Sequence, residues 1–146
     1  MSEIDIDELR SRFGRRLRIG FVGGGRDSVI GETHLAAMRV DGFFELYAGV
    51  FSVDPTVSAA TARAEFIDAN RVYGSFNEMA EKEAQREDGI EVVLIATPPH
   101  IHFEAAKAFL TRGIDVICEK PIAVNREQAV QLDELARQHG RLFCLT

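Results

Sequence analysis

Residues 90–121 constrain the fold of this chain more than any other segment, because they contain a helix pattern between two strand patterns. Residues 91–97 are apolar and rich in β-branched side chains, which is typical of a parallel strand that is buried on both faces. Residues 103–110 then repeat apolar side chains at helical spacing, and Gly113 can adopt the left-handed conformation that ends a helix. Residues 115–119 are the next expected strand.

A strand, a helix and a second parallel strand are joined by a right-handed crossover. This arrangement brings Thr97 and Lys120, at the ends of the two strands, to the same carboxyl edge of the sheet. Open α/β sheets bind their ligands at this edge. We therefore expect Thr97 and Lys120 to belong to a ligand site.

The same alternation of strands and helices continues along the rest of the chain. Further strands are expected at residues 17–22, 46–51, 72–73 and 142–145. Six strands separated by helices favour a doubly wound parallel sheet of the Rossmann type, with three layers in the order α/β/α. We assign residues 17–146 to this domain and residues 1–16 to an N-terminal extension without a function.

Several of the expected helices begin with side chains that cap helices. Asp54 precedes a proline, which is favoured at the first helical position. Ser75 and Glu78 have the spacing of a capping box, and Asn125 stands three residues before a glutamine in the same way. These signals predict helices after residues 54, 75 and 125, and apolar spacing predicts another helix at residues 31–39.

The length of 146 residues and the apolar content of 46% suit one domain with a packed core. Seventeen basic and 23 acidic side chains give a formal net charge of -6. This charge argues against general binding to nucleic acid or to anionic membranes. No segment has the pattern of a signal peptide or of a membrane-spanning helix. We therefore expect a cytoplasmic protein without a nucleic-acid or membrane partner.

The two cysteines, Cys118 and Cys144, are too few and too irregularly spaced for a disulfide framework or a zinc site. Each lies within an apolar, strand-like segment. Both are expected to be buried thiols, and no metal site is expected from their spacing.

Three consecutive glycines, Gly23, Gly24 and Gly25, follow the first expected strand. Glycines in this place suit a dinucleotide, because the turn is tight and its backbone approaches a pyrophosphate beside a helix N-terminus. A regular fingerprint would have its third glycine at Ser28, whereas the next glycine is Gly31. We interpret this spacing as a three-residue insertion. The alternative is an ordinary glycine-rich turn that binds no ligand.

The second expected strand ends near Ser52, where dinucleotide-binding folds often carry an acidic residue that holds the adenosine ribose. A serine there lacks the negative charge that repels a 2′-phosphate, so the sequence does not exclude NADP as the cofactor. Asp54 follows closely, but it also suits a helix cap. No arginine follows Ser52 directly. The sequence therefore predicts NAD or NADP without choosing between them.

Three motifs occur in order along residues 17–146, and together they resemble the N-terminal domain of a known family. The family is that of glucose-fructose oxidoreductase, inositol dehydrogenase and rhizopine catabolism proteins (Gfo/Idh/MocA). The motifs are Gly23-x-Gly25 with a later Gly31-x-x-His34, then Ala96-Thr97-Pro98-x-x-x-His102, and then Glu119-Lys120-Pro121.

The resemblance implies a nicotinamide cofactor that lies across the strand ends. Gly23, Gly25 and the loop to Gly31 would lie under its pyrophosphate, with Gly24 in the same turn. Thr97 and Pro98 would lie near its riboses and phosphates.

The resemblance also implies that Lys120 is the catalytic residue, facing the nicotinamide and the substrate. It would bind the reacting hydroxyl or carbonyl and help to move its proton while hydride passes to or from the cofactor, because neighbouring charges and partial burial tune a lysine for this work. Glu119 would hold the local geometry, with Pro121 beside it. His102 is expected to pack or hydrogen-bond near the cofactor, and His34 is expected to pack its helix.

Two departures from the family pattern limit the expected function. The family usually has asparagine where this chain has Pro99. Family members also continue into a second, C-terminal α+β domain with substrate contacts, none of which lies within these residues. We therefore expect a truncated product or an isolated domain that binds NAD(P) without full activity on a sugar, inositol or related polyol. The alternatives are a non-enzymatic dinucleotide sensor and an interaction or structural fragment that has lost cofactor binding.

Overall fold

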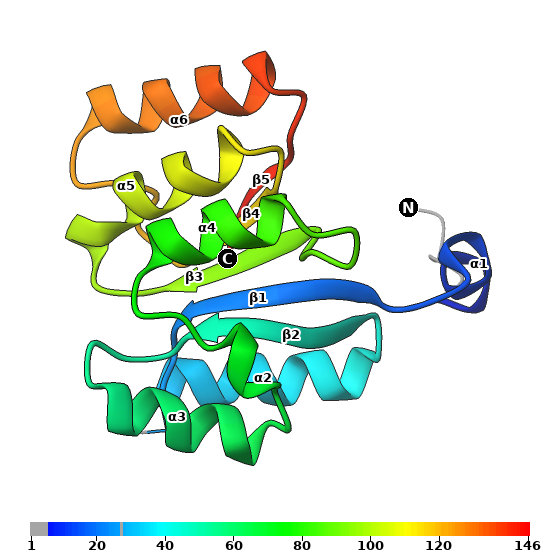
Figure 1. The fold of residues 1–146 in the computed structure, drawn as a ribbon. Coiled ribbons are helices and arrows are strands. Elements are labelled where there is room, and N and C mark those ends of the chain that lie inside the picture. The colour runs from blue at the N-terminus through cyan, green and yellow to red at the C-terminus, as the bar shows by residue number, and fades with distance from the viewer. Residues whose placement is uncertain (1–5, 27) are drawn as a thin grey trace.

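A computed structural model describes residues 6–26 and 28–146 of the chain (Figure 1). Within these residues, five strands form one sheet in the order β2-β1-β3-β4-β5, and all neighbouring strands are parallel. The strands are β1 (Leu17–Gly23), β2 (Phe44–Val50), β3 (Val92–Ala96), β4 (Asp115–Cys118) and β5 (Phe143–Leu145). The predicted Rossmann-type parallel sheet is confirmed.

Helices cover both faces of the sheet, as predicted for three layers. In Figure 1, α2 and α3 lie on one face, and α4, α5 and α6 lie on the other. The N-terminal helix α1 lies apart from both layers, beside the start of β1. The helices are α1 (Ile6–Phe13), α2 (Val29–Asp41), α3 (Pro55–Ala64), α4 (Phe76–Ala84), α5 (Pro99–Leu110) and α6 (Arg126–Gln138), with a short 3-10 turn at Ala69–Arg71.

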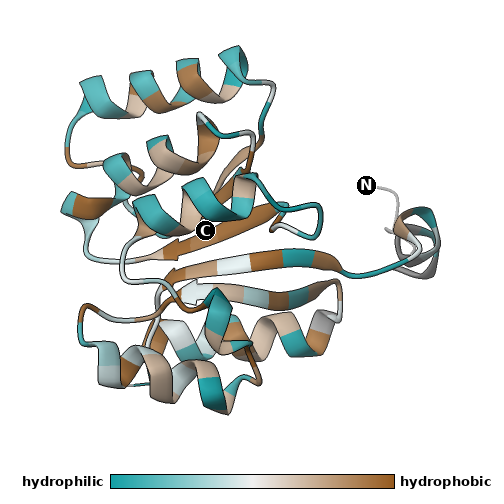
Figure 2. Cartoon of the chain, in the orientation of Figure 1, coloured by the Kyte–Doolittle hydropathy of each residue, from teal (hydrophilic) through white to brown (hydrophobic). Residues whose placement is uncertain are grey.

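The core consists of two apolar clusters, one on each face of the sheet. Every residue of β3 is buried, and Figure 2 shows this strand as hydrophobic along its length while α6 is largely hydrophilic. Val93 and Ile95 pack with the cluster under α4, α5 and α6, whereas Val92 and Leu94 pack with the cluster under α2 and α3. Because its alternating side chains meet a helix layer on either side, β3 needs an uninterrupted apolar sequence.

The expected third strand at residues 72–73 is not part of the sheet. Val72 forms only an isolated bridge with Gly49, supported by one hydrogen bond from the Tyr73 amide to the Gly49 carbonyl at 3.0 Å. Side chains fix this segment instead, because the buried Glu83 carboxylate accepts from Arg71 Nε at 3.1 Å and from the Tyr73 hydroxyl at 2.6 Å. A non-local ionic contact therefore replaces the expected strand pairing.

The predicted helix caps are present. The Asp54 carboxylate accepts a hydrogen bond from an amide of the first turn at 2.8 Å, Ser75 Oγ accepts one at 3.2 Å, and the Asn125 side chain accepts one at 2.9 Å. The capping box at Ser75 is incomplete, because Glu78 accepts from the amide of Gly74 at 3.1 Å rather than from that of Ser75. Local sequence therefore determined where these helices begin.

The two cysteines differ in exposure. Cys118 is buried in β4, and burial, with the nearby charge of Glu119, raises the pKa of its thiol to about 12. Cys144 is exposed, so the expectation that both thiols are buried was wrong for this residue. The reason is its position in β5, which forms an edge of the sheet with only one neighbouring strand.

The linker between α1 and β1 is tied to the start of β3 by one ion pair. Arg15 donates to both carboxylate oxygens of Glu91, at 2.7 and 2.8 Å. These hydrogen bonds lower the pKa of Glu91 to about 2. The first five residues of the expected 1–16 extension lie outside the described residues, and the boundary at residue 17 stays a prediction. Among residues 6–26 and 28–146, no helix is long and apolar enough to cross a membrane.

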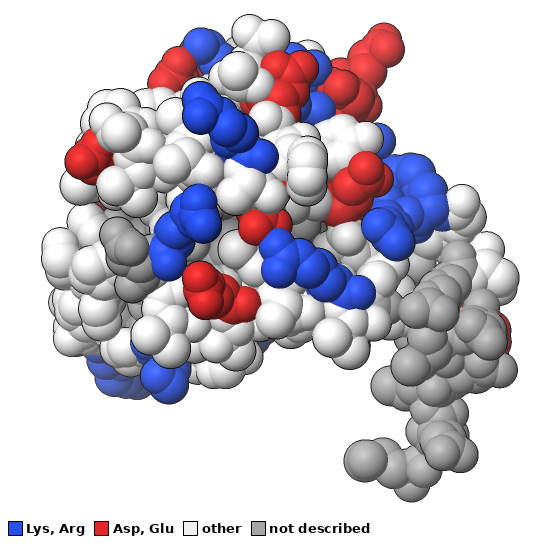
Figure 3. Space-filling view, turned by 90° about the horizontal axis from the view of Figure 1, so that it is seen from below, with Lys and Arg blue, Asp and Glu red and all other residues white. Residues whose placement is uncertain are grey.

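Charged side chains do not gather into a broad patch on the face over α2 and α3. Figure 3 shows small groups of basic side chains there, close to acidic ones. This distribution agrees with the mixed charge of the sequence, 17 basic and 23 acidic side chains. The view gives no support on this face for the continuous positive surface that nucleic-acid binding requires.

Candidate functional site

A cavity of about 600 Å³ opens over the carboxyl ends of β1, β2 and β3. Its lining combines residues of the glycine turn, the end of β2 and the loop after β3. Among the residues that line it, none is a lysine, arginine, aspartate or glutamate. Six of the predicted site residues line this cavity, namely Gly23, Gly24, Gly25, Ser52, Thr97 and Pro98.

The glycine turn leaves no room for side chains at three positions. Gly23 has a φ of +86°, and a Cβ there would lie 2.3 Å from the carbonyl oxygen of Ala96. A Cβ at Gly25 would lie 2.9 Å from the carbonyl oxygen of Phe51. A Cβ at Gly31 would lie 2.4 Å from the backbone of the glycine turn, so this residue allows α2 to pack closely against the turn. Close packing of helix and strand is the role of the third fingerprint glycine.

The helix after the turn begins earlier than the sequence suggested. α2 starts at Val29, not at Gly31, and Ser28 is its N-cap residue because Ser28 Oγ accepts from the Gly31 amide at 3.1 Å. The amide of Ser28 also donates to the Gly25 carbonyl at 2.7 Å. The inserted residues therefore lead into a capped helix start, and Ser28 at this start lines the cavity. The N-terminus of a helix favours an anion.

Ser52 lies at the expected place, at the end of β2. Its hydroxyl accepts a hydrogen bond from the amide of Asp54 at 3.1 Å. The carboxylate of Asp54 caps α3, so the interpretation of this residue as a helix cap is confirmed. The cavity that Ser52 lines thus has no carboxylate, lysine or arginine among its lining residues.

Thr97 has a hydroxyl that lacks a partner. Its Oγ1 atom is buried and has no hydrogen bond within the part of the chain that the structure describes. Buried hydroxyls are normally paired, so a group bound in the cavity or an ordered water would supply what is missing. Together with the glycine turn and the start of α2, this atom makes the cavity fit a ligand with phosphates and ribose hydroxyls.

The loop after β4 carries the predicted catalytic residue. Lys120 has 77% of its side chain exposed, and its Nζ atom lies 3.9 Å from Oε2 of Glu119. Glu119 itself is buried, and the same Oε2 atom accepts from the Lys120 amide at 3.2 Å. Neither residue, nor Pro121, lines the cavity over β1, β2 and β3. The predicted site is therefore divided between the cavity and this neighbouring loop.

His34 contacts Glu119, which the sequence did not predict. Its Nε2 atom lies 2.9 Å from Glu119 Oε1. Burial raises the pKa of Glu119, but hydrogen bonds from the side chains of Thr146 and His34 outweigh burial and bring it below its ordinary value. The carboxylate is therefore ionised and His34 donates. One feature of the sequence could have predicted this contact. His34 follows Gly31 by about one helical turn, so it faces the same strand ends.

His102 connects the loop after β3 to the loop after β4. It is fully buried, with Nδ1 at 2.7 Å from the Pro121 carbonyl and Nε2 at 2.8 Å from the Thr97 carbonyl. A neutral imidazole donates to one of these oxygens, and only the imidazolium donates to both. His102 thus hydrogen-bonds inside the protein and does not line the cavity, so its expected contact with a cofactor stays a prediction.

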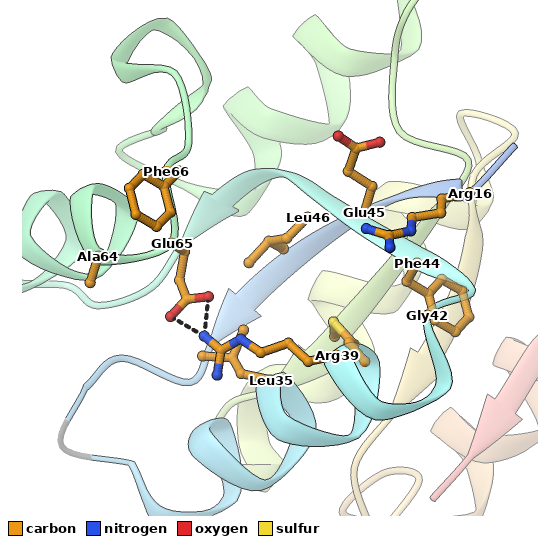
Figure 4. Close-up of a pocket in the computed structure, with 11 residues that line it drawn as sticks. Arg16, Leu35, Arg39, Gly42, Phe44, Glu45, Leu46, Ala64, Glu65 and Phe66 are labelled. Atoms are coloured by element: carbon orange, nitrogen blue, oxygen red, sulfur yellow. Dashed lines mark hydrogen bonds and ion pairs between the residues drawn. The ribbon is translucent and has the colours of Figure 1, made fainter.

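A second cavity, of about 320 Å³, lies between α2, β2 and the end of α3 (Figure 4). Arg39 and Glu65 face each other across it, with Arg39 Nη2 at 2.5 and 2.7 Å from the two carboxylate oxygens. Phe66 stands at its rim and is 96% exposed. Because these two charges neutralise each other and no carboxyl end of a strand lines it, this cavity does not compete with the first as a ligand site.

Comparison with known proteins identifies relatives over almost the whole chain. A family profile described as "Oxidoreductase family, NAD-binding Rossmann fold" matches residues 17–146. The chain is 40% identical over 131 residues to the uncharacterized oxidoreductase YfiI of Bacillus subtilis, covering 89% of this chain and 33% of that protein. It is 31% identical over 124 residues to the rhizopine catabolism protein MocA of Rhizobium meliloti, covering 85% and 35%.

A solved structure of an inositol dehydrogenase homolog from Azotobacter vinelandii has a TM-score of 0.87 with this chain and 38% sequence identity. The similarity covers 90% of this chain and 34% of that one. That protein was crystallised with NAD+, and also with NADH and myo-inositol. The chain therefore spans about a third of the length of the relatives that it matches.

Proposed function

Because the chain belongs to the Gfo/Idh/MocA oxidoreductase family, in which this region forms an NAD-binding Rossmann fold, we propose that its cavity over β1, β2 and β3 binds a nicotinamide dinucleotide. The observation that carries the proposal is the glycine turn. A Cβ at Gly23, Gly25 or Gly31 would collide with backbone, and the turn leads into the capped start of α2 at the cavity edge. A pyrophosphate needs this combination of close backbone approach and free amides.

The residues around the cavity suggest how the dinucleotide is held. The pyrophosphate lies over the turn Gly23–Gly25 and the amides that follow Ser28. Ser52 lies at the adenosine ribose, where its hydroxyl is an uncharged partner. Thr97 supplies its unpaired Oγ1 after a rotation of its side chain, because this atom is buried.

We further propose that NAD is preferred over NADP. Binding a 2′-phosphate requires positive charge, and none of the residues that line the cavity is a lysine or an arginine. The relatives do not decide this point, because the family includes proteins with either cofactor. One solved relative, a biliverdin reductase from Synechocystis that is 26% identical, was crystallised with NADP+.

Lys120 is proposed to act on the substrate beside the cofactor. The nicotinamide, when bound, supplies or accepts a hydride. Lys120 has an exposed ammonium group that can bind a substrate hydroxyl or carbonyl and exchange a proton with it, and the Glu119 carboxylate 3.9 Å away keeps the group oriented. Because this chain spans about a third of its relatives, dinucleotide binding is proposed for the chain itself. Oxidation or reduction of a sugar, inositol or related polyol is proposed for this region as part of a protein as long as its relatives.

A fluorescence titration of the 146-residue chain with NADH tests the proposal. Wild type should bind NADH at least tenfold more tightly than NADPH. Gly25→Ala should weaken NADH binding at least tenfold, equivalent to about 1.4 kcal/mol, because its Cβ points at the Phe51 carbonyl at the edge of the cavity. Gly74→Ala is the matched control, since a Cβ at that exposed position meets only the Glu78 side chain at 3.5 Å.

Two results would decide against the proposal. If neither NADH nor NADPH bound at millimolar concentration, the chain would be a fragment without cofactor affinity. If Gly25→Ala and Gly74→Ala bound NADH equally well, the dinucleotide would bind somewhere other than the glycine turn.

A further inference from the structure

The contact between His34 and Glu119 joins two parts of the proposed site that the sequence separates by 85 residues. His34 is on α2, the helix whose start packs against the glycine turn. Glu119 is in the loop after β4, directly before Lys120. The imidazole and the carboxylate are 17% and 10% exposed, so the hydrogen bond is largely shielded from water.

Glu119 needs this contact because its carboxylate is buried. Its polar and charged neighbours are the His34 ring, the Thr146 side chain, the Lys120 amide and, at 3.9 Å, the Lys120 ammonium group. The adjacent Cys118 thiol is neutral, since its pKa is raised to about 12. A buried carboxylate that loses a hydrogen-bond donor either takes up a proton or moves towards solvent. Either change would move the loop that carries Lys120.

The same helix also contacts the glycine turn, over which the pyrophosphate is proposed to lie. Ser28 caps α2 at the edge of the cavity, and Gly31 in its first turn touches the glycine turn. His34 is one helical turn further on and donates to Glu119 Oε1, while Glu119 Oε2 accepts from the Lys120 amide. These contacts join α2 to the loop with Lys120.

We infer that His34 is a positioning residue, which holds Glu119 and thereby sets Lys120 at a fixed place relative to the dinucleotide. This inference rests on the proposed function, because the bound dinucleotide defines the place at which Lys120 is needed. His34 itself touches neither the cavity nor Lys120 in the structure.

Nuclear magnetic resonance of the lysine side chains tests the inference, because the chain has three lysines, Lys82, Lys107 and Lys120. After reductive 13C-methylation, which keeps their charge, each gives a separate signal, and Lys120→Arg assigns that of Lys120. In wild type, NADH should shift the Lys120 signal and leave the other two unchanged. In His34→Leu, the Lys120 signal of the free chain should move, and its response to NADH should fall by at least half.

Two further variants separate positioning from general damage to the helix. His34→Gln places an amide donor near the position of Nε2 and should restore the wild-type Lys120 signal and its response to NADH. Thr33→Val removes a hydroxyl on the same helix that bonds only to the Val29 carbonyl, and it should leave both unchanged. If His34→Leu does not fold, His34→Gln alone tests the inference. A folded His34→Gln variant whose Lys120 signal differs from that of wild type would contradict it.

The carboxylate of Glu119 gives an independent measurement. In a chain with 13C-labelled glutamate, with Glu119→Gln for assignment, the pKa of Glu119 should rise in His34→Leu, because the carboxylate stays buried but loses one of the hydrogen bonds that lower its pKa. His34→Gln should reverse most of this rise.

The outcomes distinguish the inference from the proposed function. If wild type binds NADH and His34→Leu leaves the Lys120 signal, its NADH response and the pKa of Glu119 unchanged, His34 has no positioning role. If no chain binds NADH but His34→Leu still moves the Lys120 signal and His34→Gln restores it, the link from His34 to Lys120 stands and the proposed binding of a dinucleotide fails.

Discussion

The two edges of the sheet use opposite kinds of side chain. At the carboxyl edge, the cavity over β1, β2 and β3 is lined by glycines, by apolar and neutral polar side chains and by His100, with no lysine, arginine, aspartate or glutamate. At the amino edge, a cavity of about 480 Å³ is crowded with charge. Its charged lining residues are Arg18, Glu83, Arg86, Glu87, Glu91, Arg112, Asp115 and Arg141.

Most of the charged side chains at the amino edge form hydrogen bonds or ion pairs within the chain. Arg15 holds Glu91, Arg18 donates to the Gly89 carbonyl at 2.7 Å, and Arg141 donates to the Gly113 carbonyl at 3.2 Å. The carboxyl edge is instead connected by His34 and His102, which bond behind the cavity and leave its lining free. At the amino edge, ion pairs hold parts of the chain together, whereas the carboxyl edge keeps the open cavity at which we propose that the dinucleotide binds.

The largest effect is expected from a change in the ionic network beside the amino edge. Glu83→Gln removes the buried counter-charge of Arg71 and leaves the half-exposed Asp88 carboxylate, 3.1 Å from Arg71 Nη1, so the free energy of unfolding should fall by about 3 kcal/mol. Urea unfolding measures this loss. Folded Glu83→Gln should bind NADH as wild type does, because the amino edge is remote from the cavity at the carboxyl edge. Tyr73→Phe, which removes one hydrogen bond to Glu83, should cost only about 1 kcal/mol.

A change at the carboxyl edge should reverse this pattern. Gly31→Ala forces a Cβ to within 2.4 Å of the Gly24 carbonyl oxygen, so α2 must shift away from the turn. We expect a loss of at least tenfold in NADH affinity, with a cost in stability of about 1 to 3 kcal/mol. Fluorescence titration and urea unfolding measure the two effects. Unchanged affinity in Gly31→Ala would remove the functional difference between the edges.

A smaller, pH-dependent effect is expected at the ion pair of the amino edge. Arg15 lowers the pKa of Glu91 from 4.5 to about 2, so the folded state gains stability above pH 4.5 and loses it as pH falls towards 2. Because the carboxylate is one-third exposed, screening limits the gain to about 1 kcal/mol at pH 7. Urea unfolding should show Glu91→Gln less stable than wild type at pH 7 and equally stable near pH 2. A constant difference across this range would contradict the ion-pair argument.

The smallest effect is expected away from both edges. Phe66 has a φ of +59° just after α3 and is 96% exposed, so its side chain contributes almost no burial to offset the left-handed backbone. Phe66→Gly should raise the free energy of unfolding by about 0.5 kcal/mol and leave NADH binding unchanged. Thermal unfolding measures the gain. A loss of stability would show that the Phe66 ring contributes packing at the rim of its cavity.

Some features of the fold followed directly from short stretches of sequence. The apolar run that became β3 predicted a strand buried on both faces, and the caps at Asp54, Ser75 and Asn125 predicted three helix starts. Each of these signals acts within a few residues. The glycines that line the cavity were also predicted, because a tight turn after a strand requires them locally.

Other features were missed because they depend on residues that are distant in the sequence. Residues 72–73 did not join the sheet, since the buried Glu83 holds this segment through side chains. Cys144 was expected to be buried, but an apolar strand sequence does not show that the strand lies at an edge. His34 was expected only to pack, because its partner Glu119 is 85 residues away.

The sequence by itself determined the alternating elements, the parallel Rossmann-type sheet and the position of the glycine turn, because periodicity, capping and glycine conformation are local properties. Only the tertiary structure decided where charge is placed. It left the cavity lining without lysine, arginine, aspartate or glutamate and joined the start of α2 to the lysine loop through one largely buried hydrogen bond. The physical reason is that burial and pairing of polar groups depend on which surfaces meet when the helices pack on the sheet.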